Sequence, residues 1–358
     1  MAFGLFKKKK KTDDRYQMMT IKEVVKVATD AVNLVFEKPA KFQYEPGQFI
    51  TIIDEVGGKK IRRAYSLCTT PFDDERPAVT VKRVPGGAMS NHLNDNMKAG
   101  SQLEVMEPMG MFTTTYDDLK SRNAVFFGGG SGITPLISII RSMLIKEPNS
   151  NAVLVYGNRS EEYIIFKELI ETLEKKYEGR FKAIHVLESG EADYIGRPTE
   201  EMIEEICNAN SCDDQTEFYI CGPQPMMDIV SSGLKKAKYS DSNIMMESFD
   251  SSKDETSSKK SKKSGDIEES EVTILLDGEE YSMTVKKSDS VLDTALKNDL
   301  DMPYSCQSGL CTACRGKCVE GQISIDEAEG LSQDELDDGY VLTCVGKPLS
   351  DRIKVEIG

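Results

Sequence analysis

The sequence predicts three domains in a row: an antiparallel β-barrel, an α/β domain built on a parallel sheet, and a smaller domain that carries spaced cysteines. Short β-rich segments broken by glycine turns fill the first third of the chain. Strand and helix patterns then alternate, and a polar stretch separates them from the cysteine-bearing end. A length of 358 residues, at ~150 residues per domain, allows two or three such units, each with its own core.

The domain expected over residues 18–115 is rich in strand-forming residues, and turn dipeptides such as Pro46-Gly47 and Gly57-Gly58 separate its segments. Six short strands of this kind predict a closed antiparallel barrel. The expected strands are 20–27, 33–37, 48–53, 60–67, 79–84 and 102–106.

The domain expected over residues 116–249 alternates strands with amphipathic helices. In segment 166–177 apolar side chains recur at helical spacing, which indicates a face packed on a core. Such alternation predicts a parallel sheet covered on both faces, with ligands at the carboxyl ends of its strands. The expected strands are 124–127, 152–156, 181–187 and 217–221, and the helices that follow them are 136–144, 166–177, 200–207 and 226–237.

Four cysteines near the C-terminus have the spacing of a metal centre. Cys306, Cys311 and Cys314 lie in one short loop, with four and then two residues between them, and Cys344 follows at a distance. This is the spacing of plant-type [2Fe-2S] ligands. The alternatives are structural zinc, which is usually held by two tight pairs, and disulfides, which need an oxidising compartment that nothing in the chain indicates. The nearby Cys318 fits no ligand position and is expected to be a small buried side chain.

Charge and composition exclude several classes of function. A net charge of −15, without a basic patch interleaved with aromatics, disfavours a nucleic-acid partner. Residues 271–358 hold 18 acidic and 8 basic side chains, so an acidic face there would suit a basic docking patch. A surface that only keeps the domain in solution is the alternative. No uncharged stretch is long and unbroken enough to span a bilayer, and we expect a cytoplasmic protein.

Two segments are expected to lie outside the domains. Residues 1–17 carry Lys7 to Lys11 behind a small apolar cluster and are expected to be a disordered tail, with contact to an anionic membrane surface as the alternative. Residues 250–270 have almost no apolar side chain to bury, so we expect a flexible linker. Such a linker tethers the cluster domain, residues 271–358, while leaving it free to move, unless it is an inert spacer.

The segment Arg63-Ala64-Tyr65-Ser66 has the chemistry of a flavin site. On a strand, Arg63 and Tyr65 share one face while Ala64 and Ser66 share the other. A guanidinium binds phosphate, and a phenol ring packs on a flat heterocycle. The turn at Gly86-Gly87 then opens a short helix whose backbone N–H groups suit a pyrophosphate, which favours FAD over FMN.

Three strand ends of the middle domain carry candidate nucleotide-binding residues. The glycine-rich segment 128–135 permits close approach of backbone to phosphate, although Ile133 breaks the fingerprint of three spaced glycines. Arg159 follows the second strand, where a guanidinium can grip the 2′-phosphate that distinguishes NADPH from NADH. Cys221-Gly222-Pro223 follows the fourth strand, and for its thiol a buried position is the alternative to a role in the site.

Together these motifs resemble the flavin and nucleotide domains of the ferredoxin–NADP reductase superfamily. Residues 271–358 resemble a plant-type ferredoxin domain. The second resemblance implies an α+β β-grasp fold for these residues. The domain order resembles that of the reductase components of multicomponent oxygenases. The phenylacetyl-CoA epoxygenase reductase and its ketosteroid-hydroxylase relatives are the most similar group, on Leu103-Glu-Val-Met, Tyr156-Gly-Asn-Arg and Gly339-Tyr-Val-Leu-Thr-Cys. The lysine-rich tail has no counterpart in this resemblance.

The resemblance implies roles for individual residues. Arg63 contacts the flavin phosphate, Tyr65 packs on the isoalloxazine, and Ser66 hydrogen-bonds near its N5 atom. Cys221 lies beside the nicotinamide, and Phe249 covers the other flavin face. The catalytic residues expected are Ser66, Cys221 and Phe249, and Glu247 is carried over from the same terminal stretch without an assigned role. The residues expected to bind FAD or the nucleotide are Arg63, Ala64, Tyr65, Ser66, Gly87, Met89, Ser90, Gly130, Gly132, Thr134, Pro135, Asn158, Arg159, Cys221, Gly222, Pro223 and Phe249.

The expected activity is electron transfer from NADPH through FAD to the [2Fe-2S] cluster and on to a separate oxygenase, hydroxylase or desaturase. NADPH gives up two electrons together, whereas the cluster accepts one at a time, so a flavin is needed between them. NADH is the alternative donor. The alternative functions are a membrane-surface reductase for a fatty-acid desaturase or hydroxylase, supported only by Lys7 to Lys11, and a redox carrier or sensor that does not oxidise NADPH.

Overall fold

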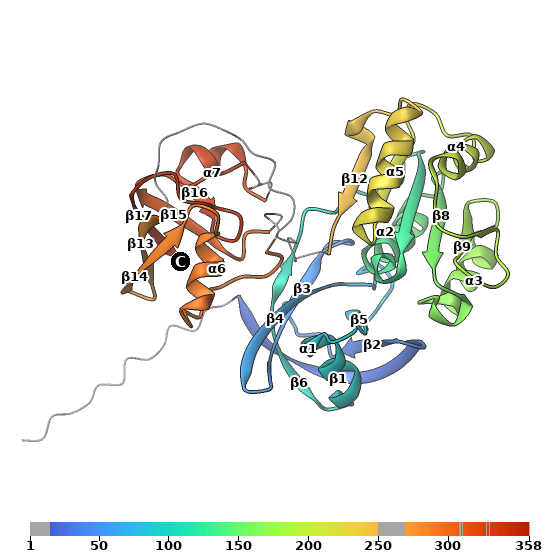
Figure 1. Ribbon diagram of the computed structural model, residues 1–358. Coiled ribbons are helices and arrows are strands. Elements are labelled where there is room, and N and C mark those ends of the chain that lie inside the picture. The colour runs from blue at the N-terminus through green and yellow to red at the C-terminus, as the bar shows by residue number, and fades with distance from the viewer. Residues whose placement is uncertain are drawn as a thin grey trace, which may run out of the picture.

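The computed structural model describes residues 15–249 and 269–357, apart from residues 308, 310, 327 and 329. Nearly all of the expected linker and of the expected basic tail lie outside these residues, and the last two residues of the expected linker, Glu269 and Ser270, begin the first strand of the C-terminal domain. Each domain contributes one sheet, and the N-terminal barrel lies between and below the other two domains in Figure 1. None of the helices in the described part of the chain is long and apolar enough to cross a membrane.

The N-terminal sheet has six antiparallel strands in the order β4-β3-β6-β1-β2-β5. An isolated bridge between Leu67 and Val79 joins its two edges, so the sheet curls into a barrel whose edges meet there. Fully buried apolar side chains such as Ile21, Leu34 and Ile52 fill its inside. The prediction of a six-stranded antiparallel barrel is confirmed. The elements are β1 (Tyr16–Ala28), β2 (Ala31–Phe36), β3 (Phe49–Val56), β4 (Lys59–Ser66), β5 (Ala78–Lys82), α1 (Ala88–Asn96) and β6 (Gln102–Met109).

The middle domain is a six-stranded sheet in the order β10-β9-β8-β7-β11-β12, with every neighbouring pair parallel. Two separate apolar clusters pack against its strands, one containing α2 and α3 side chains and the other containing α4 and α5 side chains. The predicted parallel sheet with both faces covered is therefore confirmed. The strands are β7 (Asn123–Gly129), β8 (Asn151–Asn158), β9 (Phe181–Leu187), β10 (Tyr194–Ile195), β11 (Glu217–Cys221) and β12 (Ile244–Glu247), and the helices are α2 (Ile133–Lys146), α3 (Lys167–Lys176), α4 (Glu200–Ala209) and α5 (Gln224–Lys236).

The C-terminal domain is a mixed five-stranded sheet in the order β14-β13-β17-β15-β16, in which β13 and β17 are parallel. Helix α6 packs its buried residues Val291, Leu292 and Ala295 into the core of this sheet. Cys318 is half-buried at the edge of that core, so the expectation of a buried side chain is wrong. The elements are β13 (Glu269–Leu276), β14 (Glu279–Lys286), α6 (Val291–Lys297), β15 (Arg315–Glu320), α7 (Gln333–Asp337), β16 (Tyr340–Leu342) and β17 (Arg352–Ile357).

The cluster domain docks on strands β3 and β4 of the barrel. The Arg62 side chain, only 5% exposed, donates to Asp301 across the interface at 2.6 Å, and its guanidinium lies over the Tyr304 ring, 5.3 Å from the centroid. Thr51 and Ser305 share a buried hydroxyl hydrogen bond beside this pair. Because Arg62 is largely removed from water, it needs the Asp301 carboxylate, and the ion pair fixes where the cluster domain sits.

An apolar contact surrounds this polar one. Phe49, Ile53 and Met106 of the barrel form one buried cluster with Cys311 and Ala313 of the cysteine loop. Packing of this kind excludes water and ties the position of the loop to the barrel core. The cysteine loop is therefore part of the interface.

Replacing Asp301 by Asn is expected to loosen the docking, because Arg62 then stays buried without its counter-ion. Asp301 is 61% exposed, so we expect a cost of only about 1 kcal/mol. Faster hydrogen–deuterium exchange in residues 49–66 would show it. Asp351→Asn removes an equal charge from the exposed residue before β17 and should leave that exchange unchanged. Equal exchange in both variants would contradict the assigned role of the ion pair.

Candidate functional site

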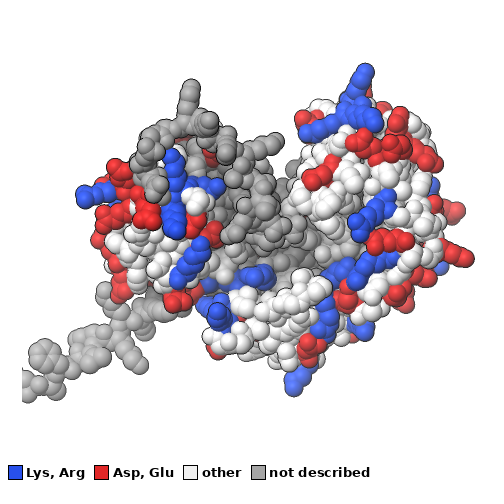
Figure 2. Space-filling model, viewed as in Figure 1, with Lys and Arg blue, Asp and Glu red and all other residues white. Residues whose placement is uncertain are grey.

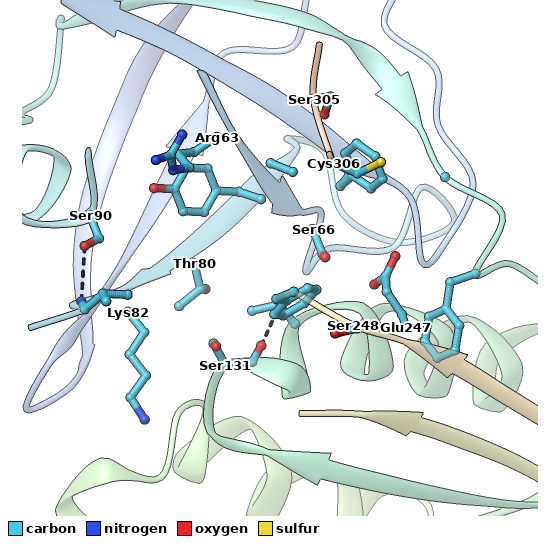
Figure 3. Close-up of a pocket in the computed structure, with 18 of the residues that line it drawn as sticks. Arg63, Ser66, Thr80, Lys82, Ser90, Ser131, Glu247, Ser248, Ser305 and Cys306 are labelled. Atoms are coloured by element: carbon cyan, nitrogen blue, oxygen red, sulfur yellow. Dashed lines mark hydrogen bonds between the residues drawn. The ribbon is translucent and has the colours of Figure 1, made fainter. Parts of the chain in front are cut away.

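One cavity of about 650 Å³ lies where the three domains meet, within the range of roughly 300–1,000 Å³ typical of cofactor sites. Figure 3 shows side chains from the barrel, from the nucleotide domain and from the cysteine loop around the same space. Of the residues predicted to bind FAD or nucleotide, those that border it are Arg63, Ala64, Tyr65, Ser66, Gly87, Met89, Ser90, Thr134 and Phe249.

The end of strand β4 forms the barrel wall of the cavity. Burial along this segment does not follow the predicted alternation, since Arg63 and Ala64 are exposed, Tyr65 is half-buried and Ser66 is buried. All four residues border the cavity at this edge of the sheet. Burial raises the pKa of the Tyr65 phenol, so its ring is a neutral, largely apolar surface on which a flat heterocycle can pack.

Helix α1 begins beside the same wall. Gly87 is its N-cap and provides no side-chain cap, so the first backbone N–H groups of the helix remain available to an anion. A Cβ at Gly87 would lie 2.7 Å from Ser90 Oγ and 2.9 Å from Val84 Cβ, so only glycine fits this turn. The arrangement fits a dinucleotide flavin, with its pyrophosphate at the α1 N-terminus and Arg63 close by.

Ser66 and Glu247 stand at the other end of the cavity, near Cys306 (Figure 3). Ser66 Oγ and Glu247 Oε2 are buried and have no hydrogen-bond partner among the described residues. Burial raises the pKa of Glu247 to about 8, and the nearby Cys306 thiol adds to the rise while Ser66 opposes it. Buried polar atoms without a partner are costly. Their position fits the polar edge of a flavin ring, which would satisfy both.

The glycine loop of the nucleotide domain packs directly on the segment after β11. A Cβ at Gly132 would lie 2.0 Å from the Cys221 carbonyl oxygen, and one at Gly129 would lie 2.6 Å from Pro223 Cδ. Glycines are required at these positions because two backbone segments meet there. The carboxyl ends of β7 and β11 thus form one rigid floor, the position expected for a nucleotide in a parallel sheet.

Cys221 is fully buried in the core of the nucleotide domain and does not border the cavity. Burial raises the pKa of its thiol well above the usual value, and the neighbouring Glu247 adds to the rise. Here the structure supports the alternative interpretation, a buried strand-end cysteine. The other predicted residues outside the cavity are Gly130, Gly132, Pro135, Asn158, Arg159, Gly222 and Pro223.

The end of strand β8 forms a second, outer part of the site. Both polar atoms of the Asn158 amide are buried and unpartnered within the part of the chain that the structure describes. Arg159 extends outward with its side chain 56% exposed, stacks on the Tyr163 ring at 3.8 Å and donates to Asp30 of the barrel at 2.7 Å. These groups suit the ribose and phosphate end of a nucleotide.

The four predicted cysteine ligands come together in pairs. The Cys306 thiol lies close to the thiols of Cys311 and Cys344, and the Cys314 thiol lies close to that of Cys344. No three His, Cys, Asp or Glu side chains among the described residues converge as ligands of one metal ion. A chain of paired thiols fits a dinuclear cluster, in which the four thiolates are shared between two irons, better than it fits a single zinc ion.

Several functional candidates were not predicted from the sequence. Lys82 borders the cavity from β5 and reaches the glycine loop, with its Nζ 2.9 Å from where a Cβ on Gly130 would stand. Asp30 and the interface pair of Arg62 and Asp301 were also missed. The sequence around a charged residue does not indicate which residue it will contact, because these contacts join segments far apart in the chain.

Comparison with known proteins agrees with this geometry. Three family models match in order: the oxidoreductase FAD-binding domain over residues 18–114, the oxidoreductase NAD-binding domain over 126–232 and the 2Fe-2S iron-sulfur cluster binding domain over 274–349. The structure of phthalate dioxygenase reductase shares the fold, with a TM-score of 0.59 at 23% identity, covering 96% of this chain and 98% of that one.

Two curated relatives match almost from end to end. The ferredoxin reductase component of 3-ketosteroid-9-alpha-monooxygenase from Rhodococcus rhodochrous is 35% identical, covering 96% of this chain and 97% of the relative. One subunit of the 1,2-phenylacetyl-CoA epoxidase from Escherichia coli (strain K12) is 30% identical, covering 95% of this chain and 97% of the relative. The chain therefore belongs to the family of oxygenase reductase components that pass electrons from NAD(P)H through FAD to a [2Fe-2S] cluster.

Proposed function

We propose that this protein oxidises NADPH and delivers single electrons to a separate oxygenase or hydroxylase. The observation that carries the proposal is the cavity bordered by all three domains, in which Ser66, Glu247 and Cys306 lie close together. When bound, FAD converts a two-electron donor into one-electron transfers that an iron-sulfur cluster accepts. The domain limits proposed for this arrangement are 18–115, 116–249 and 271–358, and the first strands of the first and third domains begin two residues before these limits, at Tyr16 and Glu269.

In this proposal the barrel residues hold and orient the flavin. Arg63 and the α1 N-terminus bind its phosphates, Tyr65 packs on the ring, and Ser66 donates a hydrogen bond near N5. Phe249, which is 43% exposed at the cavity, would cover the other face of the flavin ring. Glu247, with its raised pKa, can carry a proton at the ring edge next to Ser66.

The nucleotide domain holds NADPH at the carboxyl ends of its strands. The glycine loop and Thr134, which lies at the start of α2, receive the pyrophosphate, and Asn158 uses its buried amide on the nucleoside. Arg159 binds the 2′-phosphate. We infer that Cys221 acts from beneath the nicotinamide site, by shaping its floor with Gly222 and Pro223.

An oxygenase is the proposed acceptor because the two relatives described above are named as parts of a monooxygenase and of an epoxidase. The cluster domain is the acidic part of the chain, and Figure 2 shows acidic side chains along its outer edge. This edge would suit an acceptor with a basic patch. The membrane-surface alternative rests on residues outside those described, and no structural observation favours it.

Replacing the ligand Cys314 by Ser tests the electron route. We expect loss of NADPH-driven electron delivery to a one-electron protein acceptor such as cytochrome c, because the cluster cannot assemble. Reduction of ferricyanide by the flavin domain should continue at close to the native rate. Stopped-flow absorbance separates the two events.

Cys318→Ser is the matched control for that experiment, because Cys318 is a half-buried thiol of the same domain outside the ligand set. It should retain both activities. Loss of ferricyanide reduction in Cys314→Ser would contradict separable flavin and cluster steps.

Replacing Arg159 by Ala tests the proposed preference for NADPH. Loss of a charge-assisted phosphate contact at an exposed site is expected to lower the ratio of kcat/KM for NADPH to that for NADH by about tenfold. Arg197→Ala removes an exposed arginine that pairs with Glu188 in the same domain, and it should leave the ratio unchanged. An unaltered ratio in Arg159→Ala would place recognition of the phosphate elsewhere.

A further inference from the structure

The turn between strands β1 and β2 of the barrel reaches across to the proposed phosphate-binding residue. Thr29 donates a backbone hydrogen bond to the Glu162 carbonyl oxygen of the nucleotide domain at 3.0 Å. Next to it, Asp30 Oδ2 accepts from Arg159 at 2.7 Å. The backbone contact holds the turn in place, so the carboxylate meets Arg159 at a fixed position.

A second cation lies close to the Asp30 carboxylate. Its Oδ2 lies 3.9 Å from the Lys82 ammonium, while its Oδ1 is buried and unpartnered among the described residues. The Asp30 side chain is only 15% exposed. If Arg159 turns away toward a phosphate, Lys82 still neutralises the carboxylate, so the release of Arg159 does not leave a buried charge without a counter-ion.

We propose, on the basis of the proposed function, that Asp30 is a specificity-determining residue of the nucleotide site. Its carboxylate occupies Nη2 of Arg159, a donor that a 2′-phosphate needs for a bidentate contact. NADPH must therefore displace Asp30 from Arg159, whereas NADH, which lacks this phosphate, does not. A residue of the flavin domain thus lowers the preference of the nucleotide domain for NADPH.

The displacement of Asp30 is feasible because the Arg159 side chain is exposed and stacked on an aromatic ring. Arg159 is stacked on the Tyr163 ring and more than half exposed, so its guanidinium can rotate between carboxylate and phosphate without leaving the ring. A phosphate carries more charge than a carboxylate and offers more acceptor oxygens. Competition between the Asp30 carboxylate and the 2′-phosphate decides which of these two anions Arg159 contacts.

Replacing Asp30 by Asn in the holoenzyme tests this inference by ligand binding alone. The probes are 2′,5′-ADP, which carries the distinguishing phosphate, and 5′-AMP, which lacks it, each titrated by calorimetry. We expect Asp30→Asn to tighten 2′,5′-ADP about three- to fivefold and to leave 5′-AMP unchanged. Asp30→Ser, which also removes the charge, must change the ratio of the two affinities in the same direction.

Glu37→Gln is the matched control. It removes one carboxylate from the same barrel, where Glu37 pairs with the exposed Lys22, and both affinities should stay as in the native protein. If Arg159→Ala weakens 2′,5′-ADP while both Asp30 variants leave it unchanged or weaken it, the inference is overturned and the proposed phosphate site stands. If Arg159→Ala also has no effect, the NADPH assignment fails together with the inference.

Discussion

The arrangement of this protein depends on the buried Arg62 guanidinium on the outside of the barrel. A cation that is 5% exposed is stabilised by a counter-ion, and its partner Asp301 belongs to another domain, 239 residues further along the chain. The pair, together with Thr51 and Ser305, fixes the cluster domain on β3 and β4. Loss of this contact would leave the cysteine loop held on the barrel by its apolar packing alone.

Docking has a direct consequence for function. The cysteine loop packs on the barrel through Cys311 and Ala313 and presents Cys306 to the same cavity as Ser66 and Glu247. Packing alone therefore places the cysteine loop beside the proposed flavin site. The expected mobility of the cluster domain depends on the linker, whose residues 250–268 lie outside the described residues, whereas the described parts form a docked arrangement.

Local patterns in the sequence predict the folds of the domains well. Strand alternation, helical periodicity and glycine turns are properties of neighbouring residues, and the barrel, the parallel sheet and the cysteine loop all follow from them. The roles of Arg63, Tyr65 and Ser66 remain predictions, although their place at the cavity agrees with them. Cys221 is the instructive exception, because a motif places a residue on a strand end but does not decide which way its side chain points.

The contacts between domains could not be predicted in this way. Asp30 with Arg159, and Arg62 with Asp301, join residues whose separation in sequence carries no periodic signal. In the sequence, each has the pattern of a solvent-exposed charge. Their partners become evident only when the domains are placed against one another. These contacts determine how the three domains fit together in this protein.

Zero-length cross-linking of the native holoenzyme tests the docked arrangement most directly. Lys60 Nζ lies 3.6 Å from the Asp301 carboxylate across the interface, so a carbodiimide should join them, and mass spectrometry of the digested protein would identify the bond. We predict that this bond forms and that the cross-linked protein still reduces its cluster with NADPH. Absence of the bond, or a cross-linked protein whose flavin is reduced while its cluster stays oxidised, would contradict it.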